Sequence, residues 1–150
     1  MEKDVEAIGA LFSLKKTPAA LYSPLVLAYM GDGIYEMVIR TIIVGQGNRP
    51  VNKLHREAAS LVKASAQARM LHLIEEELTE EEEGIFRRGR NATSHTMAKN
   101  ATVADYRQAT GFEALMGFLY LEGRQERLLE LIYLGLKRLG FLSEEEKKDE

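Results

Sequence analysis

The chain has 150 residues, of which 45% are hydrophobic and 29% are charged, and its formal net charge is −3. These values suit a single globular domain with a sizeable core. The sequence contains no Cys, which excludes disulfides and thiolate metal sites and fits a reducing cytoplasm. The N-terminal residues lack the order of a signal peptide, and charged residues interrupt the apolar run 21–44, which argues against a membrane span. We therefore expect a cytoplasmic globular protein.

The net charge conceals a strong asymmetry along the chain. Residues 75–83 contain seven Glu and no basic residue, and the tail 144–150 has five acids against two Lys. Together these segments carry −10, which leaves +7 for the rest of the chain. A basic face on that remainder can bind a polyanion despite the negative total.

Helical signals dominate the first part of the chain. Residues 1–16 contain a weak pattern that predicts a short helix. Ser23 followed by Pro24 is typical of an N-cap and a first helical position, so we expect a helix from 24 to about 44. This helix should end at the glycine-containing cluster 45–48.

Apolar residues at helical spacing from 50 to 74 predict one amphipathic helix. Thr79 with Glu82 three residues later is a capping box, so the glutamate run begins a helix that continues to about Arg90, and we assign the run no chemistry. The other face of the 50–74 helix is basic and polar and carries His55, Arg56, Lys63, Gln67 and Arg69.

The last third of the chain predicts a loop and two further helices. Residues 92–102 are small and polar, as in a loop, and a helix should follow from about 103 to 121. A turn then leads into a last amphipathic helix. The acidic tail 144–150 is expected to be disordered, so the domain covers residues 1–143. Because no strand-like alternation occurs, the prediction is an all-α domain of five to seven helices.

Two isolated acids stand within apolar helical stretches, Asp32 and Glu113. Hard cations such as Mg²⁺ are held by one or two carboxylates with waters and phosphates, and ion pairs with Lys or Arg of other helices are the alternative. Glycines at 31 and 33 suggest that an ion or another group closely approaches the backbone beside Asp32. Glu36 precedes Arg40 by four residues, which favours a helical ion pair, with a supporting role beside Asp32 as the second option.

A basic segment from Arg87 to Lys99 contains Arg, Lys, Asn, Ser and Thr but no aromatic residue. Such donors suit phosphates and 2′-hydroxyls across a minor groove better than stacking on single strands. A solvated surface loop is an equally weighted alternative.

Residues 27–36 read LAYMGDGIYE, residues 87–92 read RRGRNA and residues 106–117 read YRQATGFEALMG. In this order the three motifs resemble those of the Mini-III ribonucleases, the short bacterial members of the ribonuclease III family. The resemblance implies a homodimeric, all-α, Mg²⁺-dependent endonuclease that cleaves double-stranded RNA and matures the ends of 23S ribosomal RNA precursors in the cytoplasm. By position, Asp32 matches the catalytic aspartate of the family, and Glu113 matches its catalytic, metal-holding glutamate.

The sequence departs from longer ribonuclease III enzymes at two positions. Ala28 stands where they carry a glutamate and Thr110 where they carry an aspartate, so fewer carboxylates are expected to reach the metal. The expected supporting residues are Glu36, Arg40 and Thr110. No double-stranded-RNA-binding domain is expected, so the catalytic domain would hold RNA itself, and the candidate contacts are Arg87, Arg88, Arg90, Asn91, Lys99, His55, Arg56 and Lys63.

These features predict an endoribonuclease in which Asp32 and Glu113 hold Mg²⁺ and a water activated by the metal attacks the phosphodiester. A ribosomal protein is a further candidate partner. The alternative is a noncatalytic helical dimer that binds structured RNA or a ribosomal partner through the same basic face, with both acids in core ion pairs. Cleavage of duplex RNA with Mg²⁺ and then with a chelator separates the two hypotheses.

Overall fold

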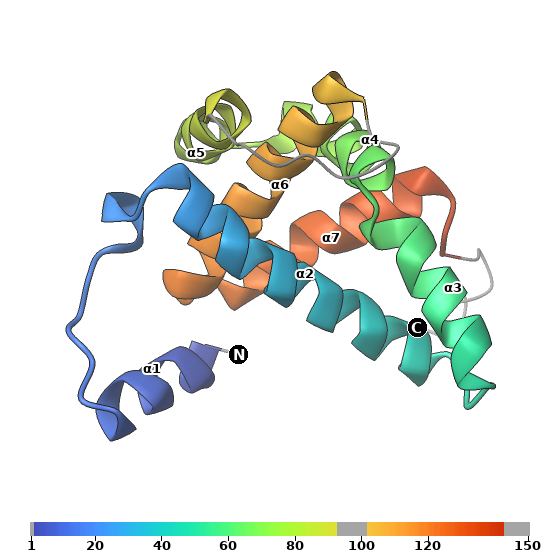
Figure 1. Ribbon diagram of the computed structural model, residues 1–150, viewed down its shortest axis with the longest axis horizontal. Coiled ribbons are helices and arrows are strands. Elements are labelled where there is room, and N and C mark those ends of the chain that lie inside the picture. Colours follow the sequence, from blue (N-terminus) through green and yellow to red (C-terminus); the bar gives the residue numbers. More distant parts are fainter. Residues whose placement is uncertain (1, 93–101, 143–150) are drawn as a thin grey trace.

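The computed structural model describes residues 2–92 and 102–142, and its regular structure is helical throughout that part of the chain (Figure 1). The predicted all-α class is confirmed. None of the described helices has the length and apolar character needed to cross a membrane. The helices are α1 Glu2–Leu11, α2 Pro24–Gly45, α3 Val51–Val62, α4 Ala64–Ile74, α5 Glu80–Asn91, α6 Val103–Leu121 and α7 Gln125–Leu139, with short 3-10 turns at Ala19–Leu21 and Glu75–Glu77.

Three predictions fall outside the described residues. These are the disorder of the acidic tail 144–150, most of the loop 92–102, and the placement of Lys99.

The core of the fold surrounds α6, which packs against α2, α4, α5 and α7 (Figure 1). Every residue from Ala109 to Leu119 is buried except Glu113. A helix that is apolar on all sides is typical of such a central position. Glu113 is therefore a carboxylate carried by the most buried element of the described fold.

Capping signals place helix starts where the sequence predicts them. The Ser23 hydroxyl accepts a hydrogen bond of 3.3 Å from the backbone N–H of Val26, and Pro24 is the first helical residue. Thr79 and Glu82 form the capping box through reciprocal hydrogen bonds of 3.1 and 2.9 Å. Each contact spans only three residues, which is why local sequence is enough to predict it.

The single helix predicted for residues 50–74 is wrong, because the chain breaks at Lys63. This residue has an extended ψ of 157° and separates α3 from α4. The break lets α3 pack on α2 while α4 packs on α6. It also changes which face of α4 is buried, so Gln67 is only 2% exposed and does not lie on the polar face where the sequence analysis places it.

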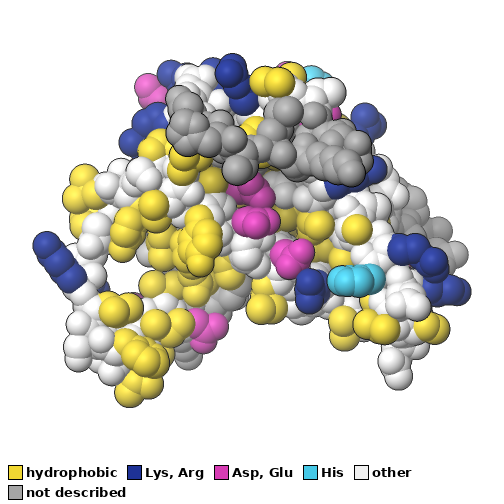
Figure 2. Space-filling model, viewed as in Figure 1, with side chains coloured by type: hydrophobic (Ala, Val, Ile, Leu, Met, Phe, Trp, Pro, Cys, Tyr) yellow, Lys and Arg dark blue, Asp and Glu magenta, His cyan; other side chains and the backbone are white. Residues whose placement is uncertain are grey.

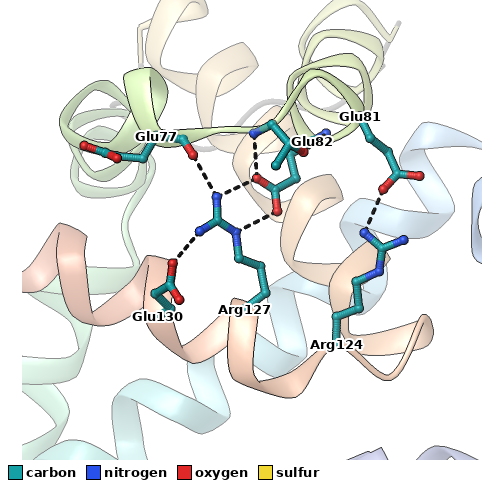
Figure 3. Close-up of polar contacts among 7 residues, drawn as sticks. Glu77, Glu81, Glu82, Arg124, Arg127 and Glu130 are labelled. Carbon is teal, nitrogen blue, oxygen red and sulfur yellow. Dashed lines mark hydrogen bonds and ion pairs between the residues drawn. The ribbon is translucent and has the colours of Figure 1, made fainter.

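The glutamate run joins α5 to α7 (Figure 3). Arg127 of α7 donates to both carboxylate oxygens of Glu82 at 2.8 Å and to the backbone oxygen of Glu77 at 2.7 Å. Arg124 donates to Glu81 at 2.7 Å. The run therefore does more than start a helix, since it also links α7 to the start of α5 through ion pairs.

Candidate active site

Two glycines let α2 and α6 cross with their backbones in contact. A Cβ on Gly31 would lie 1.6 Å from the backbone oxygen of Glu113, and a Cβ on Gly117 would lie 1.9 Å from the backbone oxygen of Leu27. Only glycine fits such an approach. The predicted close approach is confirmed at Gly31, but the approaching group is the α6 backbone, not an ion or a phosphate. Gly33 has no atom within 4 Å of its Cβ position.

This crossing brings together the two acids singled out in the sequence. Asp32 is exposed on α2, and its side chain lies beside the half-buried side chain of Glu113 on α6. Burial, followed by the neighbouring Asp32 carboxylate, raises the pKa of Glu113 to about 8, while a hydrogen bond from Gln67 acts in the opposite direction. Glu113 therefore holds its proton more tightly than an ordinary glutamate does.

Among the described residues, basic side chains do not neutralise this pair. Within residues 2–92 and 102–142, no Lys or Arg forms an ion pair with Asp32 or Glu113. The same residues contain no group of three or more His, Asp or Glu placed to hold a metal ion. The arrangement is a pair of carboxylates, open to solvent at Asp32, which suits a hard cation that keeps waters and binds phosphate.

Gln67 of α4 is a site residue that the sequence analysis missed. Its Nε2 donates to Glu113 Oε2 at 3.3 Å and to the backbone oxygen of Val62 at 2.8 Å. The available signal is spacing, because Gln67 precedes the buried residues Met70, Leu71 and Ile74 by three, four and seven positions. These four residues are recognised as one buried face only when α4 is treated as a helix separate from α3.

Tyr35 ties the end of α3 to α2 beside this contact. Its hydroxyl donates to the backbone oxygen of Leu61 at 3.0 Å, and its ring meets Phe112 of α6 edge-on with centroids 5.1 Å apart. Tyr35 is fully buried, and burial raises the pKa of its hydroxyl well above the ordinary value. The end of α3 is thus fixed to α2 through Tyr35 and to α6 through Gln67.

The predicted supporting residues lie around the pair but contact other groups. Glu36 and Arg40 form the expected ion pair at 3.3 Å, one turn beyond Asp32 on α2. Thr110 is buried, and its hydroxyl donates to the backbone oxygen of Tyr106 at 3.0 Å, within its own helix. A supporting role for these three residues stays a prediction.

The basic residues of the segment 87–99 that are described lie in the last turns of α5, as expected for a helix predicted to continue to about Arg90. Arg87 and Arg88 are exposed, and Arg87 pairs with Glu83 at 3.3 Å. The guanidinium of Arg90 lies 5.5 Å from the ring centroid of Phe86. Of this group, Arg88 is the exposed cation without an ion-pair partner among the described residues, and Asn91, also exposed, ends the helix.

A second basic group lies on α3 and at its end. His55, Arg56 and Lys63 are exposed. Figure 2 shows acidic side chains at the middle of the face that α2 crosses, and Lys, Arg and His side chains on the right over α3. The two groups of basic residues therefore come from different elements, with the α2–α6 crossing on the face between them.

Comparison with known proteins places this geometry in a family. The ribonuclease III domain matches residues 25–124, which contain α2 after its first residue, α3 through α6 and both acids. The chain is also 51% identical over 124 residues to Mini-ribonuclease 3 of Thermoanaerobacter sp. (strain X514), covering 83% of this chain and 87% of that one. The chain belongs to the ribonuclease III family. A second Mini-ribonuclease 3, from Enterococcus faecalis, is 53% identical over 122 residues, covering 80% and 92% of the two chains.

A solved structure has a similar fold. The fold is similar to the crystal structure of a Fusobacterium nucleatum protein, with a TM-score of 0.71, 33% identity, and coverage of 77% of this chain and 89% of that one. The predicted resemblance to Mini-III ribonucleases is confirmed. As a member of the ribonuclease III family, the protein is an endoribonuclease, a hydrolase of RNA phosphodiester bonds.

Proposed function

We propose that the protein is a Mg²⁺-dependent endoribonuclease for double-stranded RNA, with Asp32 and Glu113 as its catalytic, cation-holding carboxylates. One observation carries the proposal. The α2–α6 crossing holds these two acids beside each other at an exposed point, without a basic partner among the described residues. Two carboxylates so close repel each other unless a proton or a cation lies between them. In a ribonuclease, such a cation can take part in cleavage of the phosphodiester.

The residues present fit a hard cation. Mg²⁺ prefers oxygen ligands and keeps several waters when one or two carboxylates bind it. When bound, it supplies the positive charge that activates water and stabilises the phosphate. Asp32 and Glu113 would hold the cation beside the scissile phosphodiester, and the contact of Gly31 with the α6 backbone would fix the spacing of the two carboxylates.

Basic side chains on two sides of the acids are suited to a duplex. Arg88 at the end of α5 and Arg56 and Lys63 of the α3 region are exposed. Long flexible cations of this kind bind phosphates without reading sequence, as recognition of an RNA duplex by its shape requires. Arg87 contributes less, because Glu83 already neutralises part of its charge.

A homodimer would supply one acid pair for each strand of the duplex. Four apolar side chains of α2 recur at helical intervals on one exposed face, and Tyr29 and Met37 among them are 79% and 59% exposed. An apolar stripe of this kind is typical of an interface. The substitution Met37→Asp should therefore give a monomer in sedimentation, and a persistent dimer would contradict this assignment. The stripe consists of Val26, Tyr29, Met37 and Val44.

The natural substrate is proposed from the family. Relatives that share about half of their residues with this chain are named Mini-ribonuclease 3. We assign to this chain the family's role in maturing 23S ribosomal RNA precursors in the cytoplasm, carried out by residues 1–143. A ribosomal protein partner stays a prediction from the sequence.

Cleavage of duplex RNA by purified wild-type and Asp32→Asn protein tests the function. Because Asp32 is exposed, we expect its substitution to abolish cleavage while the fold and RNA binding persist. The matched control is Glu122→Gln, an exposed acid at the end of α6, which should cleave normally. Wild-type cleavage should stop with a chelator and return with Mg²⁺.

Two results would contradict the proposal. A folded Asp32→Asn variant that cleaves at the wild-type rate would exclude the assigned site. Wild-type protein that binds duplex RNA but never cleaves it would favour the noncatalytic dimer.

A further inference from the structure

Gln67 is a buried amide whose orientation is fixed from both sides of its nitrogen. The side chain is 2% exposed, and Nε2 donates to the backbone oxygen of Val62 at 2.8 Å and to Glu113 Oε2 at 3.3 Å. A rotated amide would place its oxygen against a carbonyl oxygen and a carboxylate oxygen, and both contacts would be repulsive. The N–H groups therefore face Glu113.

A purely structural role explains this residue poorly. The other end of the amide, Oε1, is buried and has no hydrogen-bond partner among the described residues. A buried polar atom without a partner is unfavourable, whereas an apolar side chain of similar length would fill the same space without that cost. What an apolar side chain cannot supply is a donor to the backbone oxygen of Val62 and to Glu113.

The contact acts on the one carboxylate in the central stretch of α6. Glu113 is held by its backbone against Gly31, so its position along the helix crossing is set, but its carboxylate can still rotate about the side-chain bonds. A hydrogen bond from a buried, doubly anchored amide removes that freedom. With Oε2 engaged by Gln67, the rotation of the carboxylate is set and Oε1 remains for a cation.

We propose that Gln67 is a positioning residue of the cation site, which fixes the rotation of the Glu113 carboxylate by donating to its Oε2. The inference rests on the proposed function, because it assumes that Asp32 and Glu113 hold the cation. Gln67 itself touches neither cation nor RNA. Its hydrogen bond to the backbone oxygen of Val62 holds the amide at the end of α3, and its hydrogen bond to Glu113 then orients that carboxylate.

Mn²⁺ binding to the RNA-free protein, followed by electron paramagnetic resonance, tests this role in the full chain. The variant Gln67→Met keeps the length and burial of the side chain but cannot donate. Loss of a side chain that orients a metal ligand commonly costs 10- to 100-fold in metal affinity, so we expect the Mn²⁺ affinity to fall by about 10-fold or more. Gln67→Asn, which withdraws the amide from Glu113 by one methylene, should also weaken binding and serves if the Met variant does not fold.

The matched control is Tyr35→Phe. It removes a buried hydrogen bond of 3.0 Å from the adjacent carbonyl, Leu61, without touching Glu113. Both Tyr35→Phe and Gln67→Met should lower the melting temperature by a few degrees, but only Gln67→Met should weaken Mn²⁺ binding. With duplex RNA, Gln67→Met should lower kcat at limiting Mn²⁺, leave the KM for RNA near its wild-type value, and regain activity as Mn²⁺ is raised.

Two outcomes overturn the inference, and the Asp32→Asn variant separates its failure from that of the proposed function. Wild-type Mn²⁺ affinity in Gln67→Met and Gln67→Asn would exclude a positioning role. Equal losses of affinity in Gln67→Met and Tyr35→Phe would show a general effect of the α3–α4 junction. If Asp32→Asn fails to weaken Mn²⁺ binding, the proposed cation site is wrong and the role of Gln67 falls with it. If Asp32→Asn weakens binding and the Gln67 variants do not, only the inference fails.

Discussion

Replacing Gly31 by Ala tests the geometry that brings the two acids together. The new Cβ would lie 1.6 Å from the backbone oxygen of Glu113, 2.5 Å from its carbonyl carbon and 2.8 Å from the backbone nitrogen of Gly117. All three atoms belong to the α6 backbone, so no side-chain rotation relieves the clash. Since ordinary contact begins at 3.4 Å, α2 and α6 must separate locally by about 2 Å.

The stability cost follows from this displacement. Overpacking a core commonly costs about 1–3 kcal/mol, and a clash with backbone belongs at the upper end. Alanine regains about 1 kcal/mol of helix propensity relative to glycine. The net loss in the free energy of unfolding is thus about 2 kcal/mol or more, which corresponds to a melting temperature lower by about 5 °C or more for a chain of this size.

The functional cost of Gly31→Ala should exceed the stability cost. Separating the helices moves Asp32 away from Glu113, and a misplacement of about 1 Å can already cost about 100-fold in rate. We therefore expect kcat/KM on duplex RNA to fall by about 100-fold or more at a temperature where the variant is folded. Differential scanning calorimetry and a single-turnover cleavage assay measure the two effects.

Gly84→Ala is the control for this substitution. Gly84 also lies inside a helix, and no atom lies within 4 Å of its Cβ position. Its replacement should stabilise the protein by about 0.5–1 kcal/mol. Gly33 is equally open, but it lies within the apolar stripe of α2 that we assign to the dimer. A Gly31→Ala protein with wild-type stability and wild-type cleavage would refute the tight crossing.

Three other predictions concern charges. Arg127→Met should destabilise the protein by about 2–3 kcal/mol in chemical denaturation, because it leaves the 2% exposed carboxylate of Glu82 without its cation. Burial raises the pKa of Glu82, but hydrogen bonds, foremost from Arg127, lower it by more, so the net pKa is below the ordinary 4.5. The stability from this pair is therefore complete at neutral pH and is lost as the pH falls below 4.5. Arg127→Met should largely remove this pH dependence. Mg²⁺ binding at pH 7 should release protons, because the cation displaces the proton held by Glu113, whose pKa is about 8. The affinity should rise as the pH approaches 8, and calorimetry in two buffers that finds no proton release would contradict this. Replacing Arg88 and Arg90 by Gln should reduce the slope of log K against log salt for duplex RNA by about 2, and an unchanged slope would remove the end of α5 from the RNA surface.

Helix limits were predictable where the deciding contacts are local. Ser23 caps α2 and Thr79 caps α5 through atoms three residues away, and α6 spans the predicted 103–121. The Glu36–Arg40 ion pair follows the same rule. In each case the physical interaction lies within one helical turn, so the identity of neighbouring residues fixes it.

Predictions failed or stayed incomplete where the deciding contact is distant in sequence. The break at Lys63 lets α3 and α4 meet different helices, and no glycine or proline marks it. Gln67 consequently appeared to lie on a polar face, although it is buried against Glu113. The glutamate run signalled a helix start, but its partner Arg127 lies 45 residues beyond Glu82.

The sequence by itself determined an all-α chain with Asp32 and Glu113 in apolar stretches of two helices, because helical periodicity and composition are properties of neighbouring residues. It also marked glycines beside Asp32 as points of close approach. Only the tertiary structure decided what approaches Gly31, namely the backbone of α6 at Glu113. That contact depends on two surfaces fitting together across the core. It turns two separate acids into one neighbouring pair, in which the pKa of Glu113 is raised and which is suited to a cation.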